Sequence, residues 1–133
     1  MSGNIDWREL FLSADGRLAR TPFWVAAGVL FALALIYEAI AGDGLRLVTG
    51  WVVYPALLYC GTCVLSKRLH DRGRSGWYAA LVLAALVAVW TAPLRFTDFA
   101  FAIVLFWATV ELAAMRGEVG ANRFGPNPLR TAA

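Results

Sequence analysis

Charged residues are scarce in this chain: Asp, Glu, Lys and Arg make up only 16% of its 133 residues. Soluble domains carry about 25% charged residues, so this shortage excludes an ordinary water-exposed surface. Instead, 60% of the residues are hydrophobic and the mean hydropathy is +0.62. We expect this excess to be buried in lipid. A membrane span needs about 20 apolar residues, so the chain has room for one membrane domain and no separate soluble domain.

Residues suited to metal or redox chemistry are also few, with one histidine and two cysteines. Cys60 and Cys63 lie in one apolar stretch, where helical geometry disfavours a disulfide between them. Cys63 and His70 would be about 10 Å apart along a helix, which is too far for binding one metal ion. We therefore expect no metal and no cofactor. No catalytic Ser-His-Asp arrangement is recognisable either.

Apolar stretches and turn residues predict an all-α fold, a polytopic membrane helical bundle that forms one domain over residues 1–133. Trp7, Leu10, Phe11 and Ala14 share one helical face, which is typical of an amphipathic helix on a membrane surface. The expected segments are a surface helix over residues 5–14, four membrane spans over 22–41, 45–66, 77–92 and 99–115, and an irregular cytoplasmic tail over 117–133.

Local signals predict the ends of these helices. Thr21 and Pro22 supply an N-cap and a first-turn proline for the first span. Ser75 can cap the third span, and Pro93 ends it. The last two spans are short, about 24–26 Å at a rise of about 1.5 Å per residue. A bent hairpin that does not fully cross the membrane is therefore an alternative for this pair.

The basic residues predict the orientation of the helices, because Lys and Arg next to membrane spans stay on the cytoplasmic side. With both termini in the cytoplasm, ten of the twelve basic residues are cytoplasmic, and only Arg46 and Arg95 are outside. A three-span alternative, which moves the tail outside, gives a weaker bias of seven against five. Since the basic residues flank apolar spans, the expected counter-charge is anionic phospholipid and not nucleic acid.

This topology returns three polar segments to the cytoplasmic surface. They are Gly16-Arg17-Leu18-Ala19-Arg20 followed by Phe23-Trp24, Arg68-Leu69-His70-Asp71 followed by Ser75-Gly76-Trp77, and Asn122-Arg123-Phe124-Gly125-Pro126 followed by Pro128. In these motifs and in their order, the chain resembles the YhaH/YhaI-like bacterial inner-membrane family, also known as domain of unknown function 805. The resemblance implies a small multi-span protein of the bacterial inner membrane, and it brings no established activity.

The corner between the second and third spans, residues 67–77, holds the densest basic cluster. Lys67 and Arg68 suit the negative C-terminal end of a helix dipole, and Asp71 can pair with either of them. Ser75 presents the N-terminus of the third span, whose free N–H groups suit an anion. Two interpretations stay open: a site for a phosphate or lipid headgroup, and a solvated loop that only orients the spans.

A binding site at this corner would use side chains from all three polar segments. The residues expected to supply charge or to orient charged groups are Arg17, Arg20, Arg68, His70, Asp71, Arg72, Arg74, Ser75, Asn122 and Arg123. His70 beside Asp71 also suggests a general base, but adjacent residues on a helix point about 100° apart. A structural histidine is the alternative to this catalytic interpretation.

Glu111 is an acid near the cytoplasmic end of the fourth span, at the depth of Lys67 and Arg68. An unpaired charge in a membrane is costly, so we expect an interhelical ion pair between Glu111 and one of these two residues. A snorkelling acid and a residue that handles protons or ions are the alternatives.

Three functional hypotheses follow. The leading one is a non-enzymatic membrane module whose basic corner binds anionic lipid headgroups or an acidic protein partner. The second is an oligomeric transporter or channel component, with Glu111 and the corner as its cytoplasmic gate. The third is a membrane-embedded enzyme that acts on lipid through His70 and Asp71. A second copy of the chain or another membrane protein is a further possible partner.

Overall fold

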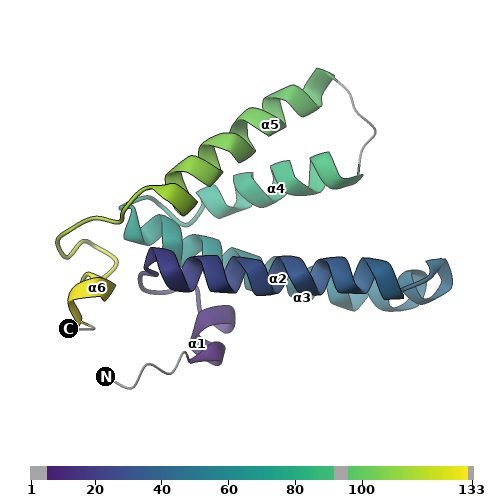
Figure 1. Ribbon diagram of the computed structural model, residues 1–133, viewed down its shortest axis with the longest axis horizontal. Coiled ribbons are helices and arrows are strands. Elements are labelled where there is room, and N and C mark those ends of the chain that lie inside the picture. Colours follow the sequence, from purple (N-terminus) through teal and green to yellow (C-terminus); the bar gives the residue numbers. More distant parts are fainter. Residues whose placement is uncertain (1–5, 92–95, 132–133) are drawn as a thin grey trace.

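The computed structural model describes residues 6–91 and 96–131, which form helices joined by short loops (Figure 1). The helices are α1 (Trp7–Leu12), α2 (Arg20–Ile40), α3 (Asp43–Asp71), α4 (Tyr78–Thr91), α5 (Phe96–Ala108), the π-helix η1 (Thr109–Ala114) and α6 (Pro128–Thr131). These residues include no β-strand, only an isolated bridge between Asn122 and Gly125. The prediction of an all-α fold is confirmed.

Two helical hairpins, α2–α3 and α4–α5, make up most of the molecule (Figure 1). α5 continues directly into η1, which contacts α2. One end of the molecule holds the start of α2, the end of α3, the loop 72–77, η1 and residues 115–127 (Figure 1). We refer to this as the polar end and to the α2–α3 turn as the far end.

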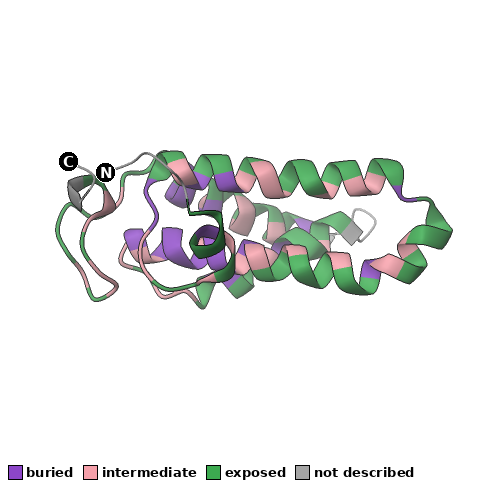
Figure 2. Ribbon diagram, turned by 90° about the horizontal axis from the view of Figure 1, so that it is seen from below, coloured by how far each residue is buried: buried purple, intermediate pink, exposed green. Residues whose placement is uncertain are grey.

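Buried residues gather at the polar end, whereas the long parts of the helices are mostly exposed (Figure 2). α2 buries Phe23 and Ala26, both near its start, and α3 buries residues mainly after position 60. Near the start of α3, Leu47 and Trp51 are 73% and 82% exposed. Long helices that expose large apolar side chains need lipid or a partner around them.

α2 and α3 are the two described helices that are long and apolar enough to cross a membrane, judged by length and composition. α4 is apolar but shorter, at 14 residues. The structure therefore supports two of the four expected spans, while the crossing by the α4–α5 hairpin stays a prediction.

The predicted N-cap of the first span is wrong. α2 begins at Arg20 with Ala19 as its N-cap, so Thr21 and Pro22 lie inside the first helical turn. The missing N–H of Pro22 costs little there, because N–H groups of the first turn have no helical partner. The earlier start has a tertiary cause, since the Arg20 side chain donates to the carbonyl of Ala114 at 3.0 Å.

Two boundaries lie three or more residues from the expected ones. α3 continues to Asp71, so the basic residues expected in a corner loop start as the last turn of a helix. α5 begins at Phe96 instead of residue 99. Pro93, the expected end of the third span, lies outside the described residues.

The short helix α1 packs against α3. Leu10 is buried, and the Lys67 ammonium donates to the carbonyls of Glu9 and Leu10. The Tyr59 hydroxyl donates to the carbonyl of Leu12 at 3.0 Å. These donors satisfy carbonyls at the end of α1 that have no helical partner, and they fix the helix beside α3.

Candidate functional site

The three polar motifs meet at the polar end, as the four-span topology predicts. The loop before α2 lies against the end of α3, where the Leu18 amide donates to the Lys67 carbonyl at 3.1 Å. The tail reaches the same place, where the Glu118 amide donates to the Asp71 carbonyl at 2.8 Å. Segments far apart in the sequence therefore build one continuous structure.

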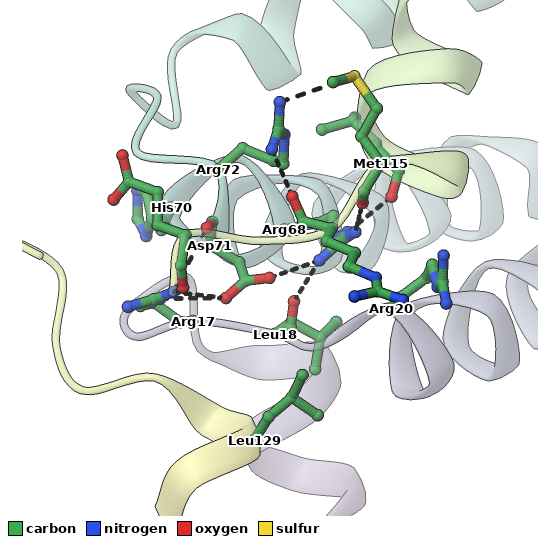
Figure 3. Close-up of polar contacts among 12 residues, drawn as sticks. Arg17, Leu18, Arg20, Arg68, His70, Asp71, Arg72, Met115 and Leu129 are labelled. Atoms are coloured by element: carbon green, nitrogen blue, oxygen red, sulfur yellow. Dashed lines mark hydrogen bonds and ion pairs between the residues drawn. The ribbon is translucent and has the colours of Figure 1, made fainter. Parts of the chain in front are cut away.

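Asp71 lies between two arginines that approach it from opposite sides (Figure 3). Arg68 Nη1 is 2.5 Å from Asp71 Oδ2, and Arg17 Nη2 is 3.0 Å from Asp71 Oδ1. All three side chains are nearly inaccessible, with exposed fractions of 0–4%. We refer to these three residues as the Asp71 cluster. Charges buried this deeply must have their remaining hydrogen-bonding groups satisfied.

Two guanidinium groups share the single carboxylate of Asp71, so most of their N–H groups need other acceptors. Main-chain carbonyls supply these acceptors. Arg68 donates to the carbonyls of Leu18, Leu112 and Met115, and Arg17 donates to those of Glu118 and Gly120, at 2.6–3.2 Å. Within the described part of the chain, no buried side-chain nitrogen or oxygen lacks a partner. The two arginines therefore link the loop before α2, the end of α3, η1 and the tail.

The end of η1 has a row of carbonyls that no further helical turn can use. Each carbonyl from residue 112 to residue 116 instead accepts from a side chain of another segment. The donors are Arg68 for Leu112 and Met115, Trp24 for Ala113, Arg20 for Ala114 and Arg72 for Arg116. Cations are also favoured at this negative end of a helix. The motif residues of α2 and α3 thus hold the end of the last long helix.

Gly117 allows the tail to pass directly over Asp71. A Cβ atom at position 117 would lie 1.9 Å from Asp71 Oδ2, far inside van der Waals contact. At Gly120, also in the tail, an added Cβ would meet nothing within 4 Å. The close approach therefore requires glycine at position 117, and the sequence alone carries no sign of this requirement.

Glu111 is 7% exposed and forms the expected ion pair, but with other partners. Its Oε1 atom is 3.2 Å from Arg72 Nη2 and 3.0 Å from Arg74 Nε. The predicted partners Lys67 and Arg68 are wrong, because α1 and the Asp71 cluster already use them. Glu111 therefore ties η1 to the loop 72–77.

His70 is held by contacts that do not involve the Asp71 carboxylate. His70 Nδ1 is 2.9 Å from the Gly16 carbonyl oxygen, and the His70 ring stacks on Phe124 with centroids 3.8 Å apart and planes 6° apart. Asp71 faces Arg17 and Arg68 instead. This geometry supports the structural alternative for the histidine.

The tail folds back onto the corner, which composition alone does not predict. Asn122 Nδ2 donates to the His70 carbonyl at 2.9 Å and to Glu118 Oε2 at 2.6 Å. Asn122 Oδ1 accepts from the Phe124 amide at 3.0 Å. The Arg123 guanidinium lies over the Phe124 ring, 4.6 Å from its centroid.

The expected site residues therefore fall into two sets. Arg17, Arg68 and Asp71 are buried, and Asn122 is a partly buried link to the tail. Arg20 and Arg123 are exposed, the Arg74 side chain is 44% exposed, and the Arg72 side chain is 18% exposed. Ser75 Oγ accepts from the Trp77 amide at 3.4 Å in the turn before α4, as a capping residue would. Arg116, which lies outside the three motifs, joins the exposed set.

Comparison with known proteins places this arrangement in a family. Residues 11–126 match the family described as "Protein of unknown function (DUF805)". The chain belongs to this family. The resemblance inferred from the three motifs is thereby confirmed, and in this DUF805 chain those motifs are the segments that build the polar end.

Two relatives support the same assignment. The chain is 33% identical over 130 residues to the "Uncharacterized protein YiiR" of Escherichia coli strain K12 and, equally, to the protein of that name in Escherichia coli O157:H7. Each match covers 89% of this chain and 87% of the relative. No solved structure matches the chain. Neither the DUF805 description nor these names supplies an activity.

Proposed function

We propose that this DUF805 protein is a non-enzymatic, multi-pass protein of the bacterial inner membrane whose cytoplasmic polar end binds anionic lipid headgroups. The exposed apolar lengths of α2 and α3 support the membrane location. The orientation is supported by the basic residues, since ten of the twelve belong to the polar end, to the loop before α2 or to the short helices α1 and α6. On this basis α4 and α5–η1 are the third and fourth membrane segments, and both termini are cytoplasmic.

The observation that carries the headgroup proposal is the division of the arginines into two sets. Arg17 and Arg68 are buried in the Asp71 cluster, so they build the frame and cannot meet a lipid. Arg20, Arg116 and Arg123 are exposed and form no ion pair among the described residues. An unpaired basic residue close to an anionic membrane surface contributes about 1 kcal/mol of attraction.

Transport and lipid-directed catalysis gain no support from this geometry. Glu111 is neutralised by two arginines, and His70 is stacked on Phe124 away from the Asp71 carboxylate. An acidic protein partner would use the same exposed arginines as a headgroup. The experiment therefore has to measure lipid directly.

Native mass spectrometry of the protein in mild detergent, titrated with phosphatidylglycerol, tests the proposal. The test variant is Arg116→Gln/Arg123→Gln, which keeps the structural link between Arg20 and Ala114, and Arg46→Gln at the far end is the control. Two lost attractions of about 1 kcal/mol each predict roughly thirtyfold weaker binding in the double variant. Arg46→Gln should bind as the wild type does. Equal binding by the double variant and the wild type would overturn the headgroup proposal.

A further inference from the structure

A groove of about 490 Å³ lies at the polar end, next to the Asp71 cluster but lined by other side chains. Its walls come from the loop after α1, the last turns of α3, the turn before α4 and the tail. The lining includes Asp15, Ser66, His70, Ser75, Trp77 and Arg123. This volume is in the range of sites that hold small molecules, about 300–1,000 Å³.

The groove presents two opposite charges that do not pair with each other. Arg123 and Asp15 both line it and both are exposed. Neither forms an ion pair within the residues that the structure describes. A single anion would meet Asp15, and a single cation would meet Arg123. The ligand that complements this groove therefore carries a negative group and a positive group.

Two neutral side chains in the groove add a hydrogen-bond acceptor and a donor. His70 Nδ1 faces a carbonyl oxygen, which can only accept, so Nδ1 carries the proton and Nε2 is the acceptor of the neutral ring. Nε2 lies on the side of Gly76, and no partner for it is found among the described residues. The Ser75 oxygen accepts from the Trp77 amide, so its O–H remains available to donate. The groove therefore offers two acceptors that suit an ammonium, Asp15 and His70, and two donors that suit a phosphate, Arg123 and Ser75.

The groove also borders the apolar part of the molecule. Thr62, which lies within the second predicted span, is in its wall, and Trp77 at its rim is 86% exposed. Trp is favoured at the level of lipid headgroups, with its ring between the apolar and aqueous phases. A headgroup seated in the groove could therefore keep its acyl chains along α3.

We infer that this groove binds the zwitterionic headgroup of an aminophospholipid, with the phosphate at Arg123 and Ser75 and the primary ammonium at Asp15 and His70. The inference rests on the lipid-binding function proposed above and adds a second lipid class with a defined site. The ligand's ammonium is expected to be primary, because Asp15 and His70 are both acceptors of N–H hydrogen bonds. A quaternary ammonium has no N–H to donate, so the groove discriminates against choline.

Native mass spectrometry with phosphatidylethanolamine and phosphatidylcholine of matched chains tests the site. The wild type should prefer phosphatidylethanolamine by about tenfold, since a hydrogen bond to a charged group contributes roughly that factor. Asp15→Ala, which removes one of the two N–H acceptors, should reduce the preference. Glu9→Ala, which removes an exposed carboxylate of α1 outside the groove, should retain it. Equal binding of the two lipids by the wild type, or an unchanged preference in Asp15→Ala, would overturn the inference.

Two further arms separate this result from the proposed function and from a soluble ligand. If the protein binds phosphatidylglycerol but shows no preference for phosphatidylethanolamine, the inference is wrong and the proposed function stands. If it shows neither phosphatidylglycerol binding nor this preference, the inference and the proposed function are both wrong. Soluble phosphoethanolamine should compete only weakly. If it displaces the lipid at equal concentration, the site belongs to a soluble phosphate ester and not to a membrane lipid.

Discussion

The two ends of the α2–α3 hairpin use the same residue types in opposite ways. At the far end, Arg46 Nη1 and Glu38 Oε2 pair at 3.3 Å with side chains that are 36% and 25% exposed. At the polar end, Arg17, Arg68 and Asp71 pair at 2.5–3.0 Å with almost no exposure. The far-end pair can exchange its partners for water, and the Asp71 cluster cannot.

This difference shows that location decides what an arginine does in this protein. Burial makes Arg17 and Arg68 structural links, because only protein carbonyls and one carboxylate are available to them. Arg46 also donates to main-chain carbonyls, those of Glu38 and Ala41, but its partial exposure leaves water as an alternative partner. At the polar end these polar links act together with a core of buried apolar side chains that includes Phe23, Leu69 and Leu112.

The sharpest test of this comparison removes one carboxylate at each end. Asp71→Asn leaves two buried guanidinium groups without a counter-charge, which should cost about 3–5 kcal/mol of stability. Glu38→Gln breaks a part-exposed pair and should cost about 0–1 kcal/mol. Thermal unfolding in one detergent, followed by tryptophan fluorescence, measures both. Equal shifts of the unfolding temperature in the two variants would contradict the distinction between the ends.

A second test adds a single methyl group to the tail. Gly117→Ala places a Cβ against Asp71 Oδ2 and should cost about 1–3 kcal/mol, the usual range for overpacking. Gly120→Ala meets open space three residues later and serves as the matched control. The same unfolding assay should separate the two variants. A stable Gly117→Ala protein would mean that the tail does not cross Asp71 closely.

Much of the architecture is predictable from the sequence, because apolar runs and turn residues carry it. The positions of α2 and α3 follow from such runs. Because two helices separate each motif from the next, the chain returns to the same end each time, and the three motifs meet there. The start of α2 is not predictable in this way. Thr21 is a good N-cap, but the contact between Arg20 and Ala114 extends the helix past it.

The sequence predicts which residues belong to the candidate site, but not how their side chains are arranged. Charge and position single out Arg17 and Arg123 equally, although one is buried and the other exposed. Helical spacing places Glu111 near Arg68, yet its partners come from a loop whose path spacing cannot give. The need for glycine at position 117 arises only from the close approach to Asp71. Such features depend on the tertiary structure.

The smallest expected effect concerns the tail, and it tests how far the influence of the Asp71 cluster extends. Phe124→Ala removes the stack on His70, which contributes about 0.5–1.5 kcal/mol, so the unfolding temperature should change little. Arg17 still donates to the Gly120 carbonyl, which anchors the chain up to that point. Amide hydrogen exchange should therefore rise over residues 121–127 and stay unchanged over 117–120, with Leu129→Ala, at a 69% exposed position, as the silent control. Faster exchange over both ranges would show that the stack, and not the buried arginine, holds the whole tail.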